Sequence, residues 1–253
     1  MSWIQPYSGL ILFILSLLVF LVVQRRLHRE IQGVFLLLTR SPALALGLFA
    51  LLFFPGILLH ETSHWITAKL LRVRTGKFSL IPQLQADGTL RLGYVEAAPA
   101  DIFRETLIGA APFISGVLAV GWIAVSRLDI FRFSQTQTGV GLNQLWSGLA
   151  ELVNLPDFWL WFYLAFTISS TMLPSASDRR AWLPTTLIIG IILMIFLIAG
   201  VGEWLLVLVD PINRVLGAVA LVFGFSLILH LCLILPFWLL RRLLSKVTGL
   251  EVI

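Results

Sequence analysis

Six long apolar runs without a charged side chain place the strongest constraint on how this chain can fold. They cover residues 1–24, 41–59, 106–126, 158–177, 181–202 and 215–240. Each approaches or exceeds the roughly 20 residues that a helix needs to cross the hydrocarbon core of a bilayer. Backbone polar groups in lipid must be satisfied within the segment, so helices are the expected structure. The sequence therefore predicts an all-α polytopic membrane protein with about six transmembrane helices, the second continuing to about Leu71.

The composition supports a membrane protein with a single domain over residues 1–253. Hydrophobic residues make up 58% of the chain and charged residues 12%, with a mean hydropathy of +0.96, whereas soluble domains carry about 25% charged residues. The net charge is +5, but the cations lie in short flanks of the apolar runs. This distribution favours the lipid bilayer as a partner and gives no indication of nucleic-acid binding. A single cysteine, Cys232, excludes an internal disulfide framework.

The distribution of basic residues predicts how the chain is oriented. With six crossings, both termini lie on the same side as the 69–105 loop, and that side carries eleven Lys and Arg residues against seven on the other. The positive-inside rule then places both termini in the cytoplasm, most simply at a plasma (inner) membrane. The cluster Arg25, Arg26 and Arg29, which follows the first run, favours the opposite orientation.

Two segments between the apolar runs have patterns of their own. Residues 76–97 contain Asp87-Gly88 between partly alternating runs, which predicts a small β-hairpin, although an ordinary ordered loop is an alternative. Residues 141–155 place leucines, a tryptophan and a valine at helical spacing, which predicts an amphipathic helix at the membrane surface. A gate over a cavity is the alternative for this helix.

The sequence H-E-x-x-H at residues 60–64 introduces three titratable side chains into an apolar stretch. On a helix, positions i and i+4 share a face, so His60 and His64 can bind one ion. Glu61 then lies beside the ion and can act as the general base that activates a zinc-bound water. Ionisable groups within a membrane helix cost about 2.5–3.5 kcal/mol each, which favours a functional reason for them. The alternative is an interfacial helix end whose polar groups reach water.

A catalytic zinc usually has three protein ligands, so the two histidines need a third. Asp178 is the best candidate, because it ends an apolar run on the same predicted side, and Pro174 lets the chain turn inward. The alternative for Asp178 is a helix cap or an ion pair with the adjacent arginines. His230 is better interpreted as a buried, hydrogen-bonded histidine than as a ligand.

At these residues the chain resembles the site-2 protease family of intramembrane zinc metalloproteases. The resemblance covers about residues 45–182, within an expected metalloprotease-like core at residues 41–182. The family has HExxH on one helix and, two helices later, an aspartate within N-x-x-P followed by D-G. "HETSH" (60–64) matches fully, and "STMLPSASDRR" (170–180) matches through Pro174 and Asp178. "IGAAPFISG" (108–116) is similar to the small-residue Gly-Pro segment of the family. Arg179 replaces the usual glycine, and Ser170 or Thr171 stands where the family has asparagine.

The resemblance implies an intramembrane zinc endopeptidase, with His60, His64 and Asp178 as zinc ligands and Glu61 as the catalytic base. Its substrates would be transmembrane segments of other membrane proteins, and the HExxH end of the helix would face the cytosol. A different class remains open, in which a non-catalytic, protease-like scaffold binds metal and holds transmembrane helices. A metal transporter is a weaker alternative, because few polar residues are available to line a path.

Overall fold

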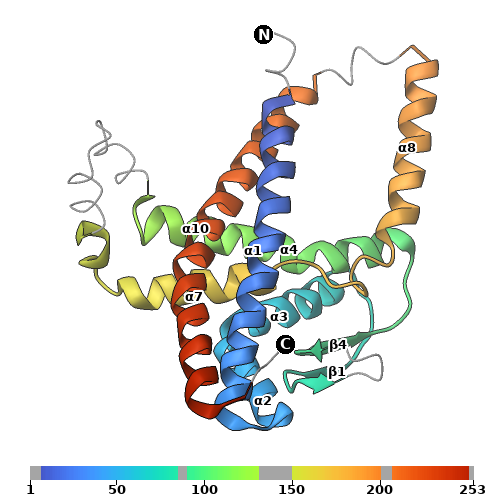
Figure 1. The fold of residues 1–253 in the computed structure, drawn as a ribbon. Helices are drawn as coiled ribbons and strands as arrows, with labels where there is room; N and C mark the ends of the chain where they lie inside the picture. Colours follow the sequence, from blue (N-terminus) through green and yellow to red (C-terminus); the bar gives the residue numbers. More distant parts are fainter. Residues whose placement is uncertain (1–6, 85–89, 131–149, 201–206, 251–253) are drawn as a thin grey trace.

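The computed structural model describes residues 7–84, 90–130, 150–200 and 207–250, which are mostly helical (Figure 1). The helices are α1 (Ser8–Thr39), α2 (Pro42–Leu52), α3 (Phe54–Leu70), α4 (Ile102–Ser126), α7 (Phe158–Thr171), α8 (Trp182–Ile198) and α10 (Val209–Thr248). The strands are β1 (Thr75–Ser79), β2 (Gln83–Leu84), β3 (Leu90–Arg91) and β4 (Tyr94–Ala97). The prediction of a membrane-type helical protein with a small β-hairpin is thus confirmed in its coarse form.

The two longest helices, α1 and α10, pack side by side and run in the same direction (Figure 1). Near their first residues, the backbone N–H of Gly9 donates to Oδ1 of Asn213 over 2.7 Å. Near their last residues, Glu30 forms an ion pair with Arg241, with 2.7 Å between Oε2 and Nε. One contact joins the early residues of both helices and the other joins later residues of both, so the two helices are parallel. The beginning of α1 and the end of α10 therefore lie at opposite ends of the pair.

The six predicted spans are not confirmed. Three described helices (α1, α4 and α10) are long and apolar enough to cross a membrane, or four if α2 and α3, bent by 73° at their junction, count as one span. The α8 helix is apolar but has 17 residues, and α7 has 14. In Figure 1, α4 and α7 run across the α1–α10 pair instead of alongside it. By length and composition, some of the apolar runs in the described residues thus form helices that are too short or too bent to count as single spans.

The parallel packing of α1 and α10 constrains how many times the chain can cross a membrane between them. Two helices that cross in the same direction require an odd number of crossings between them. Six alternating spans would instead make the first and last helices antiparallel. If α1 and α10 both cross, the two ends of the chain lie on opposite sides.

The bend between α2 and α3 has a clear origin in the sequence. Ser41 caps α2, its Oγ accepting from the backbone N–H of Leu44, and Pro42 occupies the first turn. A second proline, Pro55, lies in the first turn of α3, where a missing N–H is tolerated but helix continuation from α2 is not. Phe53, at the junction, is fully buried. The predicted second span is thus two helices, and α3 carries residues 60–64.

The β-hairpin lies against α3, the helix that carries this motif. β1 pairs with β4 in antiparallel register, and β2 pairs with β3. The Asp87-Gly88 turn lies outside the described residues, as does most of the predicted amphipathic helix at 141–155. The part of that segment which the structure describes is helical over residues 150–153.

Helices α3, α4 and α7 pack closely because glycines remove side chains at their crossings. A Cβ at Gly56 of α3 would lie within 2.2 Å of the Thr167 carbonyl oxygen of α7. A Cβ at Gly116 of α4 would lie 2.3 Å from Cβ of Met172, just after α7. Any side chain at either glycine would push these helices apart. Small residues at the crossings of membrane helices generally allow such close packing. The candidate site lies among these three helices.

Single-cysteine labelling tests the parallel arrangement of α1 and α10. In a Cys232→Ser background, Tyr7→Cys and Leu250→Cys each place a thiol at an exposed position near one end of the chain. We expect a membrane-impermeant maleimide to label these two positions from opposite sides of sealed vesicles. Labelling of both from one side would contradict a pair of parallel membrane-crossing helices.

Candidate metal site

His60, His64 and Asp178 converge, and one potential ligand atom from each lies within 4.8 Å of the others. The two Nε2 atoms of His60 and His64 are 3.2 Å apart. Oδ1 of Asp178 is 3.3 Å from Nε2 of His64, and its Oδ2 is 3.6 Å from Nε2 of His60. The side chains are largely buried, with 10–14% of each exposed. The three predicted ligands therefore meet at one point, although Asp178 lies 114 residues after His64 in the sequence.

The spacing of these three groups fits a tetrahedral metal ion. Ligand atoms about 2.0–2.1 Å from a tetrahedral zinc lie about 3.3 Å from one another. The separations of 3.2, 3.3 and 3.6 Å are close to this edge length. Two imidazoles and one carboxylate also form a donor set that catalytic zinc sites use, with a fourth position left open. The residues present therefore fit zinc both in chemistry and in spacing.

Both imidazoles are oriented by backbone carbonyl groups. Nδ1 of His60 lies 2.7 Å from the carbonyl oxygen of Thr171, and Nδ1 of His64 lies 2.8 Å from that of Ile108. A carbonyl oxygen only accepts, so each Nδ1 must carry a proton. In the neutral rings the two Nε2 atoms then face each other with bare lone pairs. A shared cation is the natural partner for such a pair, and Nδ1–H donation to a carbonyl is the usual outer support of a metal-bound histidine.

The two carbonyl groups are available because neither α4 nor α7 uses them. Ile108 lies four residues before Pro112, inside α4, and proline has no N–H to donate to the Ile108 carbonyl. Thr171 is the last residue of α7, where carbonyl groups lack partners within the helix. In the sequence, the segment at 108–116 stood out only through its similarity to the small-residue Gly-Pro segment of the site-2 protease family. The proline four residues after Ile108 is the signal that would have identified this acceptor.

A tight turn after α7 holds Asp178. The backbone N–H of Ser175 donates to Oδ2 of Asp178 over 2.7 Å, and Oγ of Ser175 accepts from the Asp178 N–H. Arg179 donates through Nε to the Ser175 carbonyl, and the carboxylate of Asp178 faces the Nε2 atoms of the two histidines instead. The structure thus favours the predicted ligand role over an Arg-paired aspartate. Gly109 lets this turn approach α4, since a Cβ there would overlap the Asp178 carbonyl oxygen.

The charge balance at Asp178 agrees with a ligand role. Burial alone would raise the pKa of its carboxyl group, but the contacts with His60 and His64 outweigh burial and hold the pKa far below its usual range. The side chain is therefore an anion at neutral pH. An anionic ligand offsets part of the charge of a divalent cation in a site with little water.

Glu61 lies beside the three ligands but is not one of them. Its side chain is buried, with 7% exposed. Gly93, just before β4, covers it closely, because a Cβ there would lie 2.9 Å from Cγ and 3.1 Å from Oε1 of Glu61. The hairpin therefore reaches the carboxylate of the motif. This contact connects the two sequence features that were interpreted separately.

The other histidines lie apart from this group. His230 is fully buried, and its Nε2 lies 2.9 Å from Oγ of Ser170, while Nδ1 lies 2.8 Å from the Ser226 carbonyl oxygen. This confirms its interpretation as a hydrogen-bonded core histidine. His28 of α1 contacts the rings of Phe49 and Phe53.

Comparisons of the chain with protein-family models, with curated proteins and with solved structures find no match. Any function assigned to the protein therefore rests on this site and on the motifs that compose it.

Removal of Asp178 tests the metal site. We expect the purified wild-type protein to carry about one zinc per chain and Asp178→Ala to lose most of it, because two histidines alone bind zinc weakly. Elemental analysis for zinc and iron measures the content and the identity of the ion. Asp210→Ala removes an exposed carboxylate at the start of α10 and is the matched control. Equal zinc in both variants would contradict the assignment of Asp178.

Substitution of Pro112 tests the role of the Ile108 carbonyl. In Pro112→Ala the new N–H can donate to this carbonyl within α4 and compete with Nδ1 of His64. Loss of such an outer contact typically weakens metal binding by about tenfold or more. Zinc competition with a chelator measures the change, and Pro236→Ala, also inside a helix, is the control. Unchanged zinc affinity in Pro112→Ala would show that the Ile108 carbonyl does not position the ligand.

Proposed function

We propose that the protein is an intramembrane zinc endopeptidase that hydrolyses peptide bonds in or near transmembrane segments of other membrane proteins. The observation that carries the proposal is the group His60, His64 and Asp178 at tetrahedral spacing beside the buried Glu61. A structural zinc site is usually closed by four protein ligands, whereas three ligands leave a position for the reaction. Among the described residues, no fourth His, Cys, Asp or Glu joins this group.

Each residue of the site has a distinct role in this reaction. When bound, zinc would polarise the scissile carbonyl group and increase the acidity of a water molecule. Glu61 takes the proton of the attacking water and passes it to the leaving amine, as a general base and then a general acid. The carbonyl groups of Thr171 and Ile108 keep the two imidazoles fixed while this proton moves. Asp178 supplies the negative charge that holds the cation.

The β-hairpin is well placed to present the substrate. A helical substrate hides its peptide bonds, so a local stretch has to unwind before cleavage. Among the described strands, β1 and β4 pair only with each other. An extended substrate can therefore add to an edge of this sheet through main-chain hydrogen bonds. Gly93 brings the β4 side of the hairpin directly over Glu61, which would place such a strand next to the general base.

The helix arrangement also supports an orientation. Because α1 and α10 are parallel, the cations of residues 25–29 and residues 241–246 lie at the same end of the pair. The two clusters that conflicted in the sequence-based count now favour the same orientation, with this end in the cytoplasm. The protein would then lie in a plasma (inner) membrane with its C-terminal end cytoplasmic. The hairpin lies toward the same end in Figure 1, which agrees with a cytosol-facing site.

A Glu61→Gln variant separates catalysis from metal binding. We expect it to retain zinc and to lose cleavage, since the amide keeps the shape of the side chain but cannot take a proton. The probe is a synthetic single-span peptide with a central Gly-Pro break and a fluorophore-quencher pair, reconstituted with the protein in vesicles. Glu151→Gln, an exposed glutamate, is the control and should cleave at the wild-type rate.

The same assay distinguishes the alternative function. A wild-type protein that binds zinc and the peptide but never cleaves it would favour a non-catalytic scaffold. Cleavage by Glu61→Gln at the wild-type rate would show that Glu61 is not the general base. Loss of zinc in this variant would make Glu61 a ligand.

A further inference from the structure

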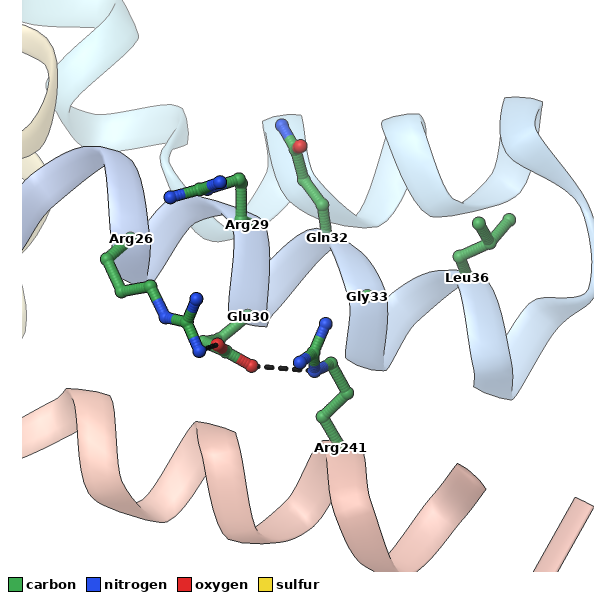
Figure 2. A pocket seen from close by; sticks show the side chains of 7 residues that line it. All are labelled: Arg26, Arg29, Glu30, Gln32, Gly33, Leu36 and Arg241. Carbon is green, nitrogen blue, oxygen red and sulfur yellow. Dashed lines mark ion pairs between the residues drawn. The ribbon is translucent and has the colours of Figure 1, made fainter. Parts of the chain in front are cut away.

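A second polar site lies between α1 and α10, on helices that contribute no ligand to the metal site. It is a pocket of about 380 Å³, shown in Figure 2. The lining residues are Arg26, Arg29, Glu30, Gln32, Gly33, Leu36 and Arg241. Three of these seven side chains are arginines, and one is acidic.

The centre of this pocket is a buried carboxylate with two arginines. Glu30 is fully buried, and its Oε1 and Oε2 form ion pairs with Arg26 at 2.9 Å and Arg241 at 2.7 Å (Figure 2). The carboxylate thus draws two guanidinium groups from different helices toward each other. A guanidinium has five N–H donors, so the ion pair of Arg26 with Glu30 leaves further donors of Arg26 in place. The side chains of Arg26 and Arg241 remain 47% and 27% exposed, respectively.

The pocket carries an excess of positive charge. Glu30 offsets one of the two charges that converge on it. Arg29 adds a third cation on the neighbouring part of α1 and forms no ion pair within the described part of the chain. The pocket therefore has a net charge of +2 in its lining. Like charges held together at a partly buried position favour a bound anion.

Gly33 contributes to the shape of the pocket. A Cβ at this position would lie 2.7 Å from Cδ of Arg241, so the glycine lets the Arg241 side chain lie directly across α1. This contact keeps the guanidinium close to Glu30. Arginine held in this way presents a planar set of donors, which suits the oxygens of a phosphate group.

The sequence around the pocket is typical of helix ends in the headgroup layer. The apolar run of α1 ends at Gln24 and that of α10 ends at Leu240, and the pocket begins just beyond both. One turn away, the guanidinium of Arg242 stacks over the ring of Trp238 at 4.1 Å. Tryptophan and arginine are enriched where a membrane helix meets the headgroup layer.

We propose that this pocket binds the phosphate group of an anionic membrane phospholipid. The free N–H donors of Arg26 and the guanidinium of Arg241 contact the phosphate oxygens, and Arg29 adds attraction at the rim. The acyl chains extend along the apolar surface of α1 and α10. The bound lipid would join the two parallel helices at their common end. A lipid phosphate and a free phosphate ion share this chemistry, but the depth of the pocket favours the lipid.

Native mass spectrometry of the purified, delipidated protein tests this site. The probes are dimyristoyl phosphatidylglycerol, dimyristoyl phosphatidylcholine and inorganic phosphate. We expect one phosphatidylglycerol to be retained in preference to phosphatidylcholine, and inorganic phosphate at equal concentration not to displace it. Arg26→Gln should lower retention about fivefold, as expected for one arginine near an anionic headgroup. Arg25→Gln, an exposed neighbour that does not line the pocket, should leave retention unchanged.

Three results would overturn the proposal. Equal losses in Arg25→Gln and Arg26→Gln would indicate diffuse surface charge instead of a site. Retention of both lipids to the same extent would remove the preference for an anionic headgroup. Displacement of the lipid by inorganic phosphate would make this a site for a free anion. Arg29→Gln, which breaks no ion pair with Glu30, repeats the test if Arg26→Gln fails to fold.

Discussion

The orientation of the two imidazoles by carbonyl groups of other helices is the interaction on which the candidate site depends. His60 points its Nδ1 at the end of α7, and His64 points its Nδ1 at the middle of α4. These two contacts turn both Nε2 atoms toward the same point. They also require α3 to lie close to α4 and α7, which the glycines at the crossings permit. The geometry of the site therefore depends on the packing of these three helices, because a shift of any of them would move a histidine or the carbonyl group that orients it.

Much of the site was predictable from the sequence, because its chemistry depends on spacing along one helix and on a scarce residue type. His60, Glu61 and His64 follow from H-E-x-x-H, and Asp178 stands out as a carboxylate at the end of an apolar run. The structure brings both histidines and Asp178 together, as predicted. The acceptors at Ile108 and Thr171 were not predicted, since a backbone carbonyl has no residue type that marks it. For Ile108, the only indication in the sequence is the proline four residues later. Pro112 shows that the Ile108 carbonyl lacks a helix partner only if the segment is known to be helical.

The fold was predicted less completely, for a physical reason. Hydropathy reports that a segment prefers an apolar environment, but it does not report direction, bending or partners. The run at 41–59 became two helices because prolines at 42 and 55 each begin a new helix. The parallel pairing of α1 with α10 rests on Asn213, Glu30 and Arg241, which are long-range contacts that no local pattern specifies. Hairpin pairing was easier, because alternating residues around a turn signal are close in sequence.

The pairing of the first and last helices has a consequence for how the protein is assembled. During synthesis, α1 enters the membrane long before α10 exists. Glu30 has Arg26 one turn earlier on the same helix, but Arg241 is synthesised 211 residues after Glu30. Until α10 has been synthesised, the surface of α1 that packs against it must be covered by lipid or by the insertion machinery. The pair forms only after α10 has been made, and a chain truncated before α10 would leave α1 without the partner along which it packs.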